Sequence, residues 1–98
     1  MVREVGTASP CKVGISVDPF ARLAVIQSGY WRDVELVYVA FVGDAARDVE
    51  ELAHGALTDA KCRGEWFWVD ADHAISAIKG ACSELGTGLR SYRLDSDG

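Results

Sequence analysis

The run ELVYVAFV, residues 35–42, constrains the fold more than any other segment of the chain. Apolar side chains occupy both alternating sets of positions, and the run is rich in the β-branched and aromatic residues that favour strands. A strand with two apolar faces is stable only when both faces are covered. We therefore expect a central strand here, in a domain whose other elements pack on both of its sides.

The segment before this strand carries a clear helix start. Asp18 is suited to accept bonds from the free N–H groups of a first helical turn, and Pro19 suits its first position. Phe20, Leu23 and Ala24 follow at helical spacing. Gly29 favours a helix end, so we predict a short helix of about three turns between Asp18 and Gly29.

Two further helices are predicted after the strand. Apolar residues recur at helical spacing from residue 49 to residue 60, which indicates an amphipathic helix that follows Gly43 and a capping Asp44. The last helix is expected to begin at a capping Asp70 and to end at Gly86. Helices thus precede and follow the expected central strand, so they are available to cover it.

Short strands complete the predicted fold. Residues 2–5 and 11–16 indicate a β-hairpin, and residues 63–70 a turn followed by an aromatic strand. The order β-β-α-β-α-β-α predicts an α+β fold, with a small, mostly antiparallel sheet of three or four strands flanked by three helices. We expect one domain over residues 1–86, followed by a polar C-terminal tail over residues 87–98.

Composition excludes several classes of protein. The chain has 98 residues, and no apolar run approaches the roughly 20 residues that span a bilayer, so no membrane partner is expected. The N-terminus lacks the apolar segment of a secretory signal, which favours a cytoplasmic location. Cys11, Cys62 and Cys82 are widely spaced and lack paired ligands, so they predict reduced, buried thiols rather than a zinc site.

The formal net charge of −5 bears on the partners of the protein. Residues 50–98 carry nine acidic and five basic side chains, against six acidic and five basic in residues 1–49. Nucleic-acid phosphates prefer basic surfaces, so the first half is the better candidate for a phosphate-bearing ligand. The acidic second half is better suited to a protein partner.

A series of short motifs runs along the chain. One of these motifs, E-x-x-x-H, places Glu50 and His54 on one face of the predicted amphipathic helix. The series is K-V-G-I-S at 12–16, D-P-x-x-R-L at 18–23, Q-S-G at 27–29, E-x-x-x-H at 50–54 and G-E-W-F at 64–67. Over residues 11–80 it resembles the GIY-YIG nuclease superfamily, in particular a compact phage and bacterial branch whose second motif reads K-[IV]-G-I-[ST].

The resemblance implies a metal-dependent endonuclease that hydrolyses nucleic-acid phosphodiesters, with DNA favoured over RNA. It assigns Arg22 to the phosphate and Glu50 to one Mg²⁺ or Mn²⁺ ion, with Lys12 as a second phosphate contact and His54 as a further catalytic candidate. The chemistry agrees, because a hard cation prefers carboxylate oxygen and a guanidinium is able to hold a phosphate through two N–H groups.

Two departures from the family pattern leave a second function open. The G-I-Y motif is absent, and its tyrosine, which helps to activate the attacking water in these enzymes, would fall near Val2. Lys12 replaces the tyrosine that opens the second motif. Tyr30 is a candidate to supply the missing phenol from another position. The general base is therefore unassigned. The alternative is a catalytically inactive module with the same fold that binds nucleic acid, or a protein partner through its acidic face.

Each candidate residue also has a purely structural alternative. Arg22 is suited to pair with Asp18 one helical turn before it, and Glu50 with His54. The imidazole of His54 is alternatively a hydrogen-bonding partner of the sheet. The aromatic residues 66–68 are expected to pack in the core and at the sheet edge rather than to stack on nucleic acid.

Overall fold

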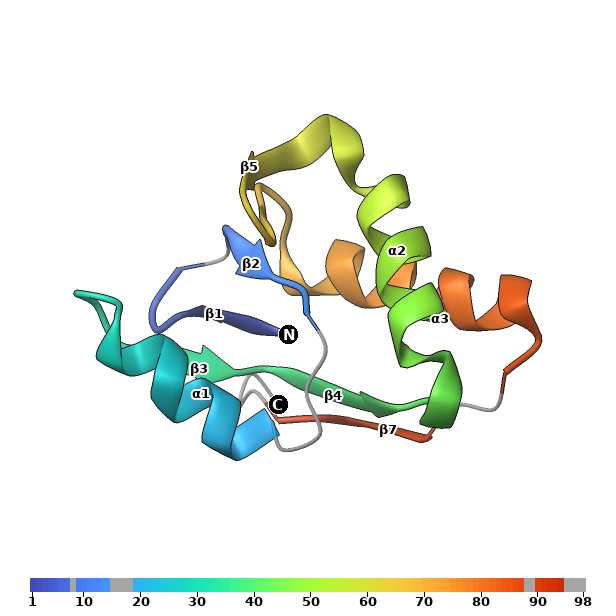
Figure 1. Ribbon diagram of the computed structural model, residues 1–98. Helices are drawn as coiled ribbons and strands as arrows, with labels where there is room; N and C mark the ends of the chain where they lie inside the picture. Colours follow the sequence, from blue (N-terminus) through green and yellow to red (C-terminus); the bar gives the residue numbers. More distant parts are fainter. Residues whose placement is uncertain (8, 15–18, 88–89, 95–98) are drawn as a thin grey trace.

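The computed structural model of the chain describes residues 1–7, 9–14, 19–87 and 90–94 (Figure 1). These residues form the predicted α+β fold, in which all the strand pairs of the described part are antiparallel. The helices are α1 (Pro19–Ser28), α2 (Ala46–Ala56) and α3 (Ala71–Leu85). The strands are β1 (Val2–Glu4), β2 (Cys11–Lys12), β3 (Val34–Leu36), β4 (Tyr38–Phe41), β5 (Lys61–Arg63), β6 (Trp66–Phe67) and β7 (Arg90–Arg93).

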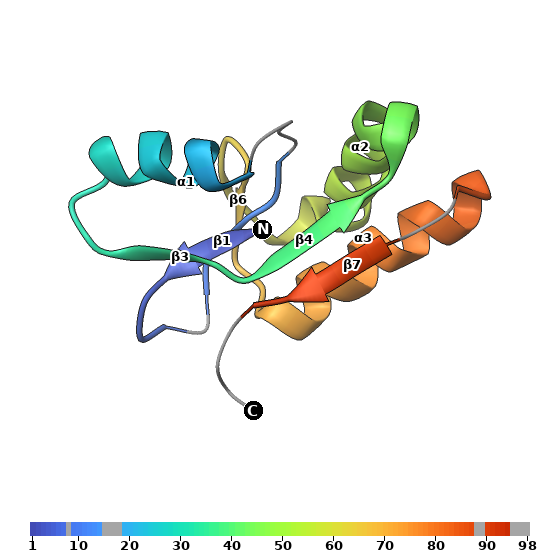
Figure 2. The same ribbon diagram turned by 90° about the horizontal axis from the view of Figure 1, so that it is seen from below.

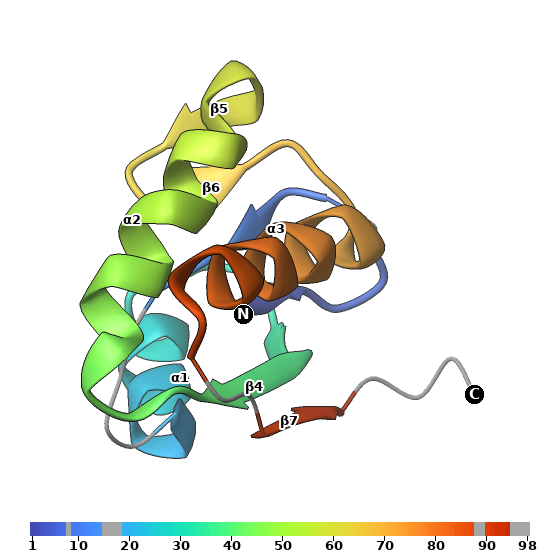
Figure 3. The same ribbon diagram turned by 90° about the vertical axis from the view of Figure 1, so that its right-hand side faces the viewer.

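The strands form two sheets rather than the single sheet expected. The larger sheet has five strands in the order β3-β1-β2-β6-β5, and the smaller is a two-stranded ribbon of β4 and β7. Helix α1 lies on one side of the larger sheet and α3 on the other (Figure 2). Helix α2 packs against α3 and crosses it (Figure 3). The strand order brings β2 and β6, which carry the first and last motifs of the sequence series, side by side.

The run ELVYVAFV does not form the single central strand that its composition predicts. Its first part is β3, at the edge of the larger sheet, and its second part is β4, in the ribbon. The break is at Val37, whose side chain is fully buried. The N–H of Val37 donates to the Met1 carbonyl at 2.9 Å, and the Val37 carbonyl accepts from the N–H of Leu94 at 2.7 Å. The two polar groups of Val37 thus bond to segments of different sheets, which divides the run.

The core lies where α2 and α3 meet the strands. Small and aliphatic side chains come from the two helices, and cysteine, valine and phenylalanine side chains come from the larger sheet. The principal members are Ala74, Ile75, Ile78 and Cys82 of α3, Val49 and Ala53 of α2, Leu57 after it, and Cys11, Val13 and Phe67 of the sheet. The apolar stripe predicted for residues 49–60 therefore faces the core at Val49, Ala53 and Leu57.

Helix α1 begins at Pro19 as predicted, whereas Asp18 lies outside the described residues. Phe20, one of the apolar residues at helical spacing, is 66% exposed, so its side chain does not face the core. The helix is anchored instead through Gln27. The Gln27 side-chain oxygen accepts from the N–H of Val34 at 2.8 Å, and its nitrogen donates to the Arg32 carbonyl at 2.8 Å. These two bonds fix α1 against β3.

The predicted caps are correct for α3 and wrong for α2. Asp70 accepts a 2.9 Å bond from the N–H of His73, and Gly86 ends α3 with a left-handed φ of 66°. Asp44 does not cap α2 because it lies inside a 3-10 turn, and Ala45, the N-cap residue, makes no side-chain bond. The 3-10 turn begins at Gly43, whose φ of 60° suits glycine.

Strand β7 lies beyond residue 86, where the sequence predicts the domain boundary and a polar tail. It pairs along its whole length with β4, and Tyr38 is opposite Arg93 while Phe41 is opposite Arg90. Arg93 also forms an ion pair with Asp72 of α3 at 2.6 Å. Residues 90–93 are thus part of the folded structure, because the free edge of β4 accepts a partner strand.

The three cysteines differ in their surroundings. Cys11 and Cys82 are buried as expected, whereas Cys62, on the short edge strand β5, is exposed. Burial raises the pKa of the Cys11 thiol to about 11, and it raises the pKa of Cys82 as well. None of the helices in the described part of the chain is long and apolar enough to cross a membrane.

Two neighbouring aromatic residues provide a test of this core. Phe67 is 1% exposed and Trp68 is 59% exposed. We expect Phe67→Ala to lower the free energy of unfolding by about 3–5 kcal/mol, since it removes a large side chain from a packed core. Trp68→Ala is the matched control and should change it by less than about 1 kcal/mol. Urea denaturation of both variants measures the difference, and equal losses would contradict the described packing.

Candidate active site

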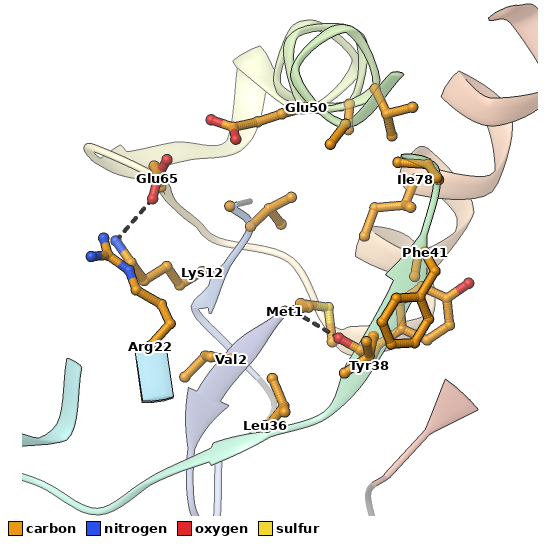
Figure 4. A pocket seen from close by; sticks show the side chains of 18 of the residues that line it. Met1, Val2, Lys12, Arg22, Leu36, Tyr38, Phe41, Glu50, Glu65 and Ile78 are labelled. Carbon is orange, nitrogen blue, oxygen red and sulfur yellow. Dashed lines mark hydrogen bonds and ion pairs between the residues drawn. The ribbon is translucent and has the colours of Figure 1, made fainter. Parts of the chain in front are cut away.

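A cavity of about 140 Å³ lies between α1, α2, the β1-β2 hairpin and β4 (Figure 4). Apolar side chains, among them Val2, Leu36 and Ile78, form much of its wall. The charged side chains that line it are Lys12 of β2, Arg22 of α1, Glu50 of α2 and Glu65 of the turn between β5 and β6. The fold therefore brings Lys12, Arg22 and Glu50, three residues named from sequence, to one hollow surface.

The backbone of Val13 connects the elements around this cavity. Its N–H donates to the carbonyl of Glu65 at 2.9 Å, and its carbonyl lies 2.6 Å from Nε2 of His54. A carbonyl only accepts, so Nε2 of His54 carries the proton in this bond. The structural alternative considered for His54, a hydrogen bond to the sheet, is therefore present. His54 also packs on the buried ring of Phe67, at 5.0 Å between ring centroids.

Glu65 is a site residue that the sequence reasoning missed. Its Oε1 lies 3.3 Å from Nζ of Lys12 in an ion pair (Figure 4). A Cβ atom on Gly14 would lie 2.8 Å from the same oxygen, so the glycine of the K-V-G-I-S motif makes room for the carboxylate. The G-E-W-F motif contains Glu65, but only the pairing of β2 with β6 shows that it faces Lys12.

Three potential metal ligands converge beside Lys12. One ligand atom each from Glu50, His54 and Glu65 lies within 4.8 Å of the others. Oε1 of Glu50 is 4.0 Å from Nε2 of His54, the nitrogen that also donates to Val13. The two partly buried carboxylates are the oxygen donors that Mg²⁺ and Mn²⁺ prefer. Glu50 and Glu65 thus fit a divalent cation, whereas Nε2 of His54 is occupied by the backbone.

The position expected for the missing tyrosine is on the cavity wall. Val2 is directly opposite Lys12 in the β1-β2 pair, and both residues line the cavity. Tyr30 does not supply a phenol there, since it is not among the described residues that line the cavity. Its hydroxyl donates to Oε2 of Glu4 at 2.7 Å, and this bond raises the pKa of Tyr30. Its ring stacks on Trp66 at 5.4 Å.

Residues 2–82 match the family described as the T5orf172 domain. The chain belongs to the T5orf172 domain family. This family is found in phage and bacterial proteins and is related to GIY-YIG-like nucleases, so membership is consistent with a nuclease-like or nucleic-acid-binding role. The part that matches the T5orf172 domain contains all four charged cavity residues and ends before β7. No curated protein and no solved structure matches the chain.

The two histidines of this T5orf172 domain provide a matched pair for a stability test. His54 bonds to the Val13 carbonyl beneath the site, whereas His73 is exposed on α3. We expect His54→Ala to lower the free energy of unfolding by about 1–3 kcal/mol, because the buried carbonyl loses its partner. His73→Ala should change it by less than about 0.5 kcal/mol. Urea denaturation at fixed pH distinguishes the two, and a His54 variant as stable as the parent protein would contradict the bond.

Proposed function

We propose that this T5orf172 domain is a metal-dependent endonuclease that hydrolyses nucleic-acid phosphodiesters at the cavity, with DNA preferred over RNA. The observation that supports it is the arrangement of Lys12, Arg22, Glu50 and Glu65 around one cavity. Two cations and two carboxylates from separate elements are an arrangement that phosphoryl chemistry uses, and the family is related to GIY-YIG-like nucleases.

The cations are assigned to the phosphate. Arg22 is exposed on α1, and its guanidinium lies on the same side of the cavity as the ammonium of Lys12 (Figure 4). A guanidinium is able to bind two phosphate oxygens at once, whereas an ammonium acts as a compact point charge. In the proposed site Arg22 orients the scissile phosphate, and Lys12 stabilises the charge that develops on it.

The carboxylates are assigned to the metal. Glu50 and Glu65 would hold one Mg²⁺ or Mn²⁺ ion, which would polarise the phosphate and lower the pKa of a bound water. Lys12 also holds the carboxylate of Glu65 in place through its ion pair, and Gly14 leaves space for it. His54 acts here as a positioning residue, because its bond to Val13 fixes β2 against the helix that carries Glu50.

The first prediction from this proposal concerns two adjacent glutamates. Glu50 lines the cavity, whereas Glu51 is exposed on α2 and is not among its described lining residues. We expect Glu50→Gln to reduce cleavage of plasmid and of structured single strands by at least about 100-fold with Mg²⁺ or Mn²⁺. Glu51→Gln should cleave as the parent protein does. Gel assays of labelled substrates, with EDTA as a further control, measure the cleavage.

Two outcomes of this assay favour the alternative, an inactive module of the same fold. The valine at the expected tyrosine position is the observation that favours it. Absence of cleavage in the parent protein, or equal cleavage by both variants, would contradict the endonuclease.

A binding measurement then divides the alternative further. Nucleic-acid binding that weakens steeply with salt would indicate a binding module, since phosphate contacts release counterions. Absence of binding at low salt would indicate a protein partner for the acidic face.

The second prediction concerns metal binding without cleavage. A cation that binds only the folded state stabilises it, by about 2.7 kcal/mol at 100 times its Kd. We expect Mn²⁺ to raise Tm by several degrees in the parent protein and in Glu51→Gln. Glu50→Gln and Glu65→Gln should each lose most of this shift. Thermal denaturation followed by circular dichroism gives Tm, and a shift that survives in both cavity variants would place the cation elsewhere.

A further inference from the structure

The ribbon of β4 and β7 has one face in the core and one face in solvent. Alternation and register place Val39, Phe41, Arg90 and Tyr92 on the outer face. The rings of Phe41 and Tyr92 meet edge to face at 6.2 Å between centroids, although they are 53% and 52% exposed. Tyr38, on the inner face, is buried. The outer face is therefore a small exposed aromatic surface with an exposed arginine.

This surface is continuous with the candidate active site. Val39 and Phe41 line the same cavity as Lys12, Arg22 and Glu50. Tyr92 touches Phe41 and extends the aromatic surface across the ribbon from β4 to β7. A ligand whose phosphate lies between Lys12 and Arg22 would reach Phe41, and Tyr92 beside it, by extending across the cavity (Figure 4).

The charge of the ribbon favours a nucleic-acid ligand over a protein one. Its strands read YVAF and RSYR, with two arginines and no acidic residue, although the chain as a whole has a net charge of −5. Arg93, on the inner face, pairs with Asp72, whereas Arg90 is exposed beside the rings. Aromatic faces stack on bases and an adjacent guanidinium attracts their phosphates.

We propose that Phe41, Tyr92 and Arg90 bind a single-stranded segment of nucleic acid beside the cavity, with a base stacked on the rings. The bases of a duplex are stacked inside the helix, so this surface selects substrates with unpaired nucleotides. The inference rests on the proposed function, because it takes the cavity as the place where the phosphate binds. Strand β7, which supplies Tyr92 and Arg90, lies outside the residues that match the T5orf172 domain, whereas Phe41 lies within them.

Binding without cleavage tests the proposal. The protein carries Glu50→Gln, which leaves Lys12 and Arg22 against the single carboxylate of Glu65 and so keeps the cavity positive without a metal. EDTA is present so that the substrate remains intact, and fluorescence anisotropy follows a labelled thymidine oligonucleotide or a hairpin duplex. Tyr92→Ala should weaken binding of the oligonucleotide on the order of 5- to 150-fold, which is the usual effect of losing one stacked base. It should leave duplex binding unchanged. Tyr92→Phe should retain the affinity, because stacking needs the ring and not the hydroxyl.

Matched variants separate stacking from general effects. Trp68→Ala removes another exposed aromatic side chain, which is not among the described cavity residues, and should bind as the parent does. Arg90→Ala should make the plot of log affinity against log salt concentration less steep, by about the amount that one phosphate contact contributes. Circular dichroism establishes that each variant is folded.

Three results would overturn the inference. The first is single-strand affinity unchanged by Tyr92→Ala, and the second is an equal loss for both ligands. The third is that the protein self-associates and that Tyr92→Ala makes it monomeric without changing its single-strand affinity. This result would assign the ribbon to a protein interface. Failure of the proposed function is distinguishable from failure of this inference. The first appears as absence of cleavage by the protein with Glu50 intact, whereas the second appears in the binding comparison, which needs no cleavage.

Discussion

The two backbone bonds of Val13 are the interactions on which the site depends. The Val13 side chain is 4% exposed, so the core holds it on one face of the chain. Its N–H is held by Glu65 and its carbonyl by His54. Lys12 and Val13 both line the cavity, so burial of the Val13 side chain anchors there the backbone that carries Lys12. The same two bonds bring the turn that carries Glu65 and the helix that carries Glu50 to that cavity.

The sequence predicts those features that depend on local pattern. The α+β class, the start of α1 at Pro19, the Asp70 cap and the Gly86 end of α3 all follow from residue types within a few positions of each other. The division of ELVYVAFV does not, because it depends on Val37 bonding to Met1 and Leu94, which are distant in sequence. An apolar run indicates that a segment is buried, but it does not indicate which partner strands its backbone will find.

The same distinction applies to the site. Lys12, Arg22 and Glu50 are found from sequence because each stands in a recognisable motif, and the fold brings them to one cavity. Glu65 stands in a motif too, but its role depends on two long-range facts. One is the pairing of Lys12 with Trp66 across β2 and β6, and the other is the approach of the Glu65 carboxylate to the space that a Cβ atom on Gly14 would fill. The spacing of the motifs predicts neither, because both depend on strand register.

The exposed aromatic ribbon was missed for a different reason. The segment RSYR reads as polar because arginine and serine dominate its average, and such a segment is usually taken as a frayed end. Pairing with β4 orders it and places Tyr92 next to Phe41. A polar strand at a sheet edge is thus compatible with a binding surface, since the backbone bonds supply its order while its side chains remain in solvent.

The acidic net charge does not argue against phosphate binding at the proposed site, because the relevant charge is local. In the cavity, the cations Lys12 and Arg22 are balanced by the carboxylates Glu50 and Glu65. A divalent cation on the two carboxylates would leave the cavity positive. Phosphate affinity at this site would then depend on the metal, whereas an empty site would present a neutral surface with little attraction for phosphate. The balance of two cations by two carboxylates therefore makes the proposed nuclease dependent on its metal for binding as well as for chemistry.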